Sequence, residues 1–134
     1  MTWEELRSFL KTSQGCVFVR DETDRLAIDI GSQRLVLELA QAFDEPWLIA
    51  VSPIVAKEDV IRPIDALEMN GQYSLGAMAV VDDVLVFRWA TSLALLDVDG
   101  LARALAFIGR EASRLVEIHA RVKPASGAVR HFAD

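Results

Sequence analysis

The 134-residue sequence has few of the residues that form covalent crosslinks or bind metal ions. Because it contains one cysteine, Cys16, no disulfide can form within the chain, and a reducing compartment is expected. Its two histidines, His119 and His131, are not part of a closely spaced Cys/His pair. We therefore expect no metal site and no cofactor.

Basic residues and long apolar runs are also scarce. The 14 Lys and Arg residues face 20 Asp and Glu residues, and the resulting net charge of −6 argues against binding to a nucleic-acid backbone. No stretch approaches the roughly 20 apolar residues of a membrane span. The opening MTWEELRSFL lacks the basic start and apolar core of a signal peptide. These absences predict a cytoplasmic protein with neither nucleic-acid nor membrane partners.

What the sequence does contain is enough apolar material for a core. Hydrophobic residues make up 52% of the chain, and the length matches one domain, so residues 1–134 are expected to fold as a single domain. The tail, residues 123–134, has few side chains that could pack, and we expect it to be mobile.

Three segments have helical periodicity. Thr2 and Glu5 have the spacing of a capping box, which predicts an amphipathic helix over residues 2–13. A short helix is expected over residues 62–69, with Pro63 in its first turn and a left-handed terminator at Asn70-Gly71.

The third helical segment is the longest. It is predicted to begin after the N-cap residue Asp97, with Asp99 at the positive end of the helix dipole. Pro124 is expected to end this helix because proline cannot donate an intrahelical hydrogen bond.

Strand patterns fill the sequence between the first two helices. CVFVR leads through the turn DETD into LAIDI, and RLVLELA and PWLIAVSPIV follow. Pro53 is expected at an edge, a bulge or a strand end. The connections are too short for parallel crossovers, so the strands are predicted to form an antiparallel meander.

A hairpin is predicted over residues 73–92, with Asp82-Asp83 at its tip. Two sets of residues would share one face of each strand: Tyr73, Leu75, Ala77 and Ala79, then Leu85, Phe87 and Trp89. Gly76 would allow a bulge or the close approach of another backbone.

Together these elements predict an α+β fold. We expect an antiparallel five-stranded sheet with helices packed on it, in the order α-β-β-β-α-β-β-α.

Few residues are placed for catalysis. Two groups of acidic residues fall at predicted turns, where Asp hydrogen-bonds its own backbone: Asp21, Glu22 and Asp24, then Asp82 and Asp83. Cys16 is better read as a small apolar residue than as a nucleophile, and His119 as a helix-end residue. GQYSLG and DVDG match neither a phosphate-binding loop nor a calcium loop. We therefore expect no enzyme.

The segment IDALEMNGQYSLGAMAVVDDVLVFRWATSLALLDVDGLARALAFIGREASRLVEI resembles the C-terminal half of the type III secretion chaperone-like fold. Leu67, Asn70, the hairpin and the run from Asp97 to Leu105 follow that layout in order. YbjN-type proteins, a family described as sensory transduction regulators, share the same fold. The likeness of residues covers about residues 64–118, and the order of elements matches over about residues 2–120.

The resemblance implies a non-catalytic, acidic homodimer that binds an unfolded or extended polypeptide client through apolar surface. The residues that it implies for the dimer contact lie on the short helix and the strand that follows: Ile64, Leu67, Met69, Tyr73, Leu75, Gly76 and Ala77. We consider Trp3, Leu6, Leu10 and Trp47 as candidates for binding a partner, although burial in the core is the favoured alternative for the two tryptophans.

Two alternatives stay open. The chain could be a small-ligand-binding domain or enzyme, with a pocket between the sheet and the long C-terminal helix. Arg88, close to Glu38 or Asp29, would then be the starting point of the site. A third possibility is a purely structural subunit of a larger assembly.

Overall fold

The computed structural model describes residues 1–56, 63–73 and 75–126. The chain forms, in order, α1 (Trp3–Thr12), β1 (Cys16–Asp21), β2 (Arg25–Ile30), β3 (Gln33–Ala42), β4 (Glu45–Ala56), α2 (Pro63–Asn70), β5 (Ala77–Val81), β6 (Val84–Ser92), the 3-10 turn η2 (Leu93–Leu95) and α3 (Val98–Ser126). None of the helices in this part of the chain combines the length and the hydrophobicity that a membrane crossing requires.

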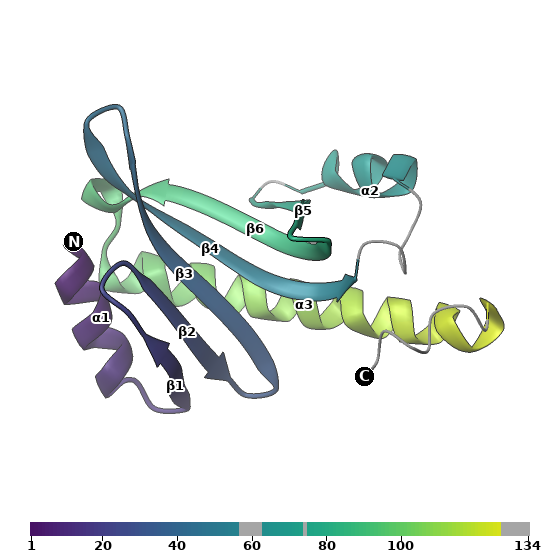
Figure 1. Cartoon of the computed structure of the whole chain (residues 1–134), viewed down its shortest axis with the longest axis horizontal. Coiled ribbons are helices and arrows are strands. Elements are labelled where there is room, and N and C mark those ends of the chain that lie inside the picture. The colour runs from purple at the N-terminus through teal and green to yellow at the C-terminus, as the bar shows by residue number, and fades with distance from the viewer. Residues whose placement is uncertain (57–62, 74, 127–134) are drawn as a thin grey trace.

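The strands form one sheet in the order β1-β2-β3-β4-β6-β5, and every neighbouring pair is antiparallel. Helix α3 runs along one face of this sheet, while α1 lies beside β1 and α2 beside β5 (Figure 1). The α+β class and the antiparallel sheet are therefore confirmed.

The predicted number of five strands was wrong, because the sheet has six. Residues Cys16–Asp21 form a separate edge strand that pairs with β2, from Cys16 opposite Ile30 to Asp21 opposite Leu26. Most of its side chains are exposed, as expected of an edge, so the sequence there lacks the strong alternation of a half-buried strand. For this reason the predicted strand count did not include CVFVR as a strand separate from LAIDI.

The core lies between the sheet and α3. Directly paired residues share a face of an antiparallel sheet, and Leu37, Ala50 and Trp89 make one such row across β3, β4 and β6. All three are buried against the helix, where Leu105 and Ile108 meet them in the same hydrophobic cluster. Full burial of a leucine or phenylalanine contributes about 1.5–3 kcal/mol, so this layer is the main source of stability.

Helix α1 begins as predicted. The Thr2 hydroxyl accepts a hydrogen bond from the Glu5 amide at 3.1 Å, and the Glu5 carboxylate accepts one from the Thr2 amide at 3.4 Å. This reciprocal pair is the expected capping box.

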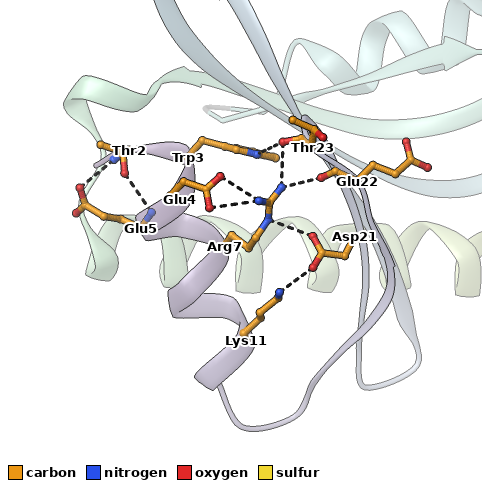
Figure 2. Close-up of polar contacts among 9 residues, drawn as sticks. All are labelled: Thr2, Trp3, Glu4, Glu5, Arg7, Lys11, Asp21, Glu22 and Thr23. Carbon is orange, nitrogen blue, oxygen red and sulfur yellow. Dashed lines mark hydrogen bonds and ion pairs between the residues drawn. The ribbon is translucent and has the colours of Figure 1, made fainter.

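The same helix is attached to the turn between β1 and β2 by polar contacts (Figure 2). Trp3 donates its indole N–H to the Thr23 carbonyl at 2.8 Å. Asp21 accepts ion pairs from Arg7 at 3.1 Å and from Lys11 at 2.8 Å. The acidic turn therefore orients α1, which agrees with a structural role for its carboxylates.

Two hairpins turn through pairs of residues with positive φ. Asp82 and Asp83, at φ 50° and 63°, join β5 to β6 at the predicted tip. Phe43 and Asp44, at φ 53° and 59°, join β3 to β4 in the same way. Two consecutive positive φ values define a type I′ turn, which matches the twist of the flanking strands.

One predicted detail of the hairpin region was wrong, because strand β5 begins at Ala77 and so excludes Tyr73 and Leu75. Gly76, with a φ of +79°, lies immediately before the strand. Within β5, Met78 is buried in the core, and Ala77 and Ala79 lie on the other face.

Helix boundaries differ in two places. Gly71 is not among the residues with positive φ, so α2 ends without a left-handed residue there, although it begins at Pro63 as expected. The Gly71 amide still donates hydrogen bonds to the Leu67 and Glu68 carbonyls.

Helix α3 starts after Asp97, whose carboxylate accepts a hydrogen bond from the Gly100 amide at 2.7 Å. The helix continues to Ser126, past Pro124, where it was predicted to end. Residues 127–134 of the predicted tail lie outside the described residues.

Strand β4 carries the irregularity expected at Pro53. Its pairing with β6 shifts register between Pro53 and Val55, so the proline sits at a bulge and the strand continues to Ala56.

Candidate protein-binding surface

Three of the four residues proposed to bind a partner lie in the core. Trp3, Leu6 and Leu10 are the buried residues of α1 and belong to the main hydrophobic cluster. For Leu6 and Leu10 the prediction was wrong, because the apolar stripe of an amphipathic helix is explained by packing on its own sheet. For Trp3 the favoured alternative, burial in the core, is confirmed. Trp47 is only partly buried, and it stays a candidate.

The clearest exposed apolar surface belongs to α2 and β5. We define the α2–β5 surface as the five exposed residues Ile64, Leu67, Leu75, Val80 and Val81. Leu67 is 66% exposed, a large value for a leucine in a helix that lies against a sheet. Three predicted dimer residues, Ile64, Leu67 and Leu75, are therefore available to a partner.

The other predicted dimer residues are less accessible. Met69 and Tyr73 are partly buried and pack against the core, and Gly76 and Ala77 are half-buried. A Cβ atom on Gly76 would lie 2.6 Å from Cε1 of Phe87 and 3.0 Å from the Arg88 carbonyl oxygen. The close approach that glycine permits is thus to the chain's own strand β6.

Strand β5 is an edge strand, and Asn70 covers part of its free edge. The Met78 amide donates to the Asn70 side-chain oxygen at 2.7 Å, and the Asn70 side-chain nitrogen donates to the Met78 carbonyl at 3.2 Å. Backbone groups alternate between the two sides of an antiparallel strand. The amide and carbonyl of Val80, two residues further on, therefore also face the free edge.

Tyr73 connects the α2–β5 region to α3. Its hydroxyl accepts a hydrogen bond from Arg114 at 3.0 Å, and Arg114 also pairs with Glu111 at 2.9 Å. The ring of Tyr73 packs edge-on against Phe87, with centroids 5.0 Å apart. Burial raises the pKa of the Tyr73 hydroxyl, which Arg114 counteracts in part.

A second apolar surface lies at the opposite edge of the sheet. We define the β1-edge surface as Val17, Val19 and Ile30, which are all exposed. Pairing with β2 shifts between Phe18 and Arg20, so Val19 lies at a bulge. Ile30 shares a face of the sheet with its paired residue Cys16, while Val17 lies on the opposite face. On the face of Ile30 lies a hollow of about 170 Å³ between α1, β1 and α3, lined by Phe9, Leu10, Ser13, Gln14, Cys16, Ile30, Ala102, Leu105 and Ala106.

Two further hollows flank α3. One, of about 290 Å³, lies between the β2–β3 turn and α3, and the other, of about 500 Å³, lies between β6 and the N-terminal half of α3. Both are open to solvent, and their linings are mostly apolar. The first hollow also has the polar side chains of Ser32, Gln33, Arg110 and Ser113 in its lining, and the Ser113 hydroxyl donates to the Gln33 side-chain oxygen at 3.1 Å.

The proposed seed of an enzyme site does not assemble. Asp29 pairs with Arg34, and Glu38 pairs with Arg25 at 3.4 Å. Arg88 lies on β6, separated from β3 by β4 and from β2 by β3 and β4. The ionisable groups of the sheet therefore form separate surface pairs along its strands.

The cysteine and the two histidines are the remaining side chains that could bind a metal ion or act as nucleophiles. Cys16 is a free thiol that packs against the core, and its burial raises its pKa. No group of three or more His, Cys, Asp and Glu side chains in the described ranges could hold a metal ion. The side chain of His119 and all of His131 lie outside what the structure describes.

Two features of these surfaces were not predicted from the sequence. One is the turn at Phe43-Asp44, although Asp44 and Pro46 are typical turn residues. The other is the side-chain contact of Asn70, which ends α2 as predicted and also hydrogen-bonds the edge of β5.

No protein-family model matches the chain, and no curated protein matches it.

Proposed function

We propose that this chain is a non-catalytic protein-binding module of the secretion-chaperone-like class. In this proposal it forms a homodimer through the α2–β5 surface and holds an extended segment of another polypeptide at the β1-edge surface. The exposure of five large apolar residues on α2, on β5 and just before β5 is the observation that carries it. Exposed apolar surface of this kind typically marks protein–protein contacts.

The dimer contact would depend on side chains more than on backbone pairing. Asn70 already occupies the amide and carbonyl of Met78, so a second β5 strand could pair only from Val80 onwards. Ile64 and Leu67 on α2 would supply the apolar contact that a short ladder lacks. A C2 arrangement would bring the same two residues together from both subunits.

The client site would use the other edge of the sheet. Strand β1 pairs on one side only, with β2, so its remaining amides and carbonyls can receive an extended peptide. The adjacent hollow can accept one or two apolar side chains of that peptide. The bulge at Val19 limits the ladder to the start of the strand, which favours a short segment.

Two matched substitutions separate these functions. Leu67→Glu and Val17→Glu each place a charge on an exposed position, at 66% and 62% exposure, on opposite edges of the sheet. Leu67→Glu is expected to abolish association through the α2–β5 surface, and Val17→Glu to leave that association intact. Sedimentation velocity measures both. A wild-type chain that stays monomeric at high micromolar concentration would refute the dimer.

The client site is tested with a permanently unfolded probe, reduced and carboxymethylated α-lactalbumin. Fluorescence anisotropy of the labelled probe is expected to show binding to the wild type and to Leu67→Glu. Val17→Glu should weaken that binding about tenfold or more, because it places a charge on an exposed apolar position of the edge strand that would pair with the probe. Equal affinity of wild type and Val17→Glu would exclude the β1 edge as the client site.

A further inference from the structure

The tip of the β3–β4 hairpin is the most exposed apolar point among the described residues. Phe43 is 90% exposed, and it is followed by two carboxylates, Asp44 and Glu45. The Trp47 indole donates to the Ala42 carbonyl at 3.1 Å, and its ring centroid is 6.4 Å from that of Phe43. The tip is therefore supported by a second aromatic side chain.

This tip is also strained. A bulky residue at φ 53° is a conformational outlier, and the left-handed region costs an L-residue about 1–2 kcal/mol. Asn or Gly is the usual choice at the first position of a type I′ turn. Phe43 thus combines two unfavourable features, exposure and strain, and such outliers cluster at sites of function.

A complementary hollow exists on the same chain. The 500 Å³ hollow beside β6 is lined by Leu75, Trp89, Leu96 and Phe107, with Arg103 among its lining residues. Arg103 forms no ion pair with any residue that the structure describes. An apolar ring followed by a carboxylate would occupy part of this hollow and place a negative charge near its arginine.

We propose that Phe43 of one copy of this chain binds in the Arg103 hollow of a second copy. A second copy is favoured because this chain carries both complementary surfaces. The hairpin tip has an exposed aromatic ring and carboxylates, and the Arg103 hollow has an apolar lining and an arginine. Contact between two tips is disfavoured, since Asp44 and Glu45 of both copies would face each other. This contact shares Leu75 with the α2–β5 surface but involves neither Ile64 nor Leu67, and it joins unlike surfaces of the two chains.

The experiment is done in the Leu67→Glu background, which removes the proposed dimer contact. Sedimentation equilibrium of that chain is expected to show self-association that weakens as salt is raised, because Asp44 and Arg103 attract. Phe43→Asn and Arg103→Glu should each weaken it, by about thirtyfold for the aromatic anchor. Absence of self-association, or an unchanged association constant for Phe43→Asn, would overturn the proposal.

Mixing the two variants gives a sharper test. Phe43→Asn keeps its hollow and Arg103→Glu keeps its tip, so an equimolar mixture is expected to form a heterodimer that neither variant forms alone. Thermal unfolding serves as the folding control: Phe43→Asn should unfold at a higher temperature than its parent, since Asn tolerates positive φ. A mixture that sediments like its separate components would contradict the assignment of tip to hollow.

Discussion

The side-chain amide of Asn70 forms two hydrogen bonds with the backbone of Met78, accepting at 2.7 Å and donating at 3.2 Å. Asn70 is the last residue of α2, and Met78 is the one residue of β5 that is buried in the core. The asparagine thus replaces a neighbouring strand at one position of a sheet edge. Its amide matches a peptide group, with one donor and one acceptor side by side.

Replacing Asn70 tests this role. Asn70→Ala leaves the Met78 amide and carbonyl without their partner, and the free energy of unfolding is expected to fall by about 1–3 kcal/mol. Hydrogen exchange at the Met78 amide should accelerate in the same variant. Gln72→Ala, an exposed neighbour in the same connection, is the control and should change neither quantity. Unchanged exchange at Met78 in Asn70→Ala would show that the contact is not formed in solution.

Substituting Gly76 and Gly31 separates the energetic cost of close packing from that of backbone strain. Both have positive φ, +79° and +61°, but a Cβ atom would meet Phe87 at 2.6 Å only at Gly76. Gly31→Ala is expected to cost about 1–2 kcal/mol of unfolding free energy from the backbone alone. Gly76→Ala should cost about 1–3 kcal/mol more, because Phe87 must shift in a packed core. Urea denaturation measures the free energy of unfolding of both variants. Equal losses would show that the Phe87 ring moves aside at no energetic cost.

Most of the fold was predictable because the strong signals are local. The capping box at Thr2, the N-cap at Asp97 and the hairpin tip at Asp82 each depend on residues a few positions apart. Apolar periodicity likewise located the residues of α3 that pack on the sheet, such as Leu101 and Leu105. These features agree with the structure because the tertiary packing reinforces them.

The predictions failed where contacts between residues far apart in the sequence determine the structure. Edge strand β1 has little buried surface to mark it, and only its pairing with β2 makes it a strand. The stripe of Leu6 and Leu10 is the same on a helix that packs internally and on one that binds a partner. The pairing of Asn70 with Met78 joins a helix end to a strand, and no spacing rule predicts it.

Acid is expected to weaken the attachment of α1. The hydrogen bond from Lys11, with the charge of Arg7 adding to it, holds the pKa of Asp21 below its usual range. A carboxyl group with a lowered folded pKa stabilises the protein above its unfolded pKa, near 3.9, and that contribution disappears as pH falls through the folded pKa.

The comparison of wild type with Asp21→Asn measures this effect. The difference in their free energies of unfolding, from urea titrations, should be present at neutral pH and shrink below about pH 4. Asp24→Asn lies in the same turn, where its side chain makes no ion pair with a described residue, and it serves as the control. A difference that is constant with pH would mean that Asp21 acts through packing and not through its charge.

The single tyrosine of the chain makes the contact between Tyr73 and α3 directly measurable. Burial raises the pKa of Tyr73, so its phenolate absorbance should appear above the usual pH of about 10. Because the folded pKa is raised, the stabilisation is complete below the unfolded pKa and is lost as pH rises through the folded one. Alkaline unfolding is therefore expected to accompany the titration.

Two neighbours of Tyr73 should shift that titration in opposite directions. Arg114 donates to the hydroxyl at 3.0 Å and its charge favours the phenolate, so Arg114→Ala should raise the pKa further. Glu111 disfavours the phenolate, and Glu111→Gln should lower the pKa. Arg110→Ala, on the same helix but without a contact to Tyr73, should leave the midpoint unchanged. If Arg114→Ala and Glu111→Gln moved the midpoint in the same direction, loosening of α3, and not charge, would be the cause, because only charge predicts opposite signs.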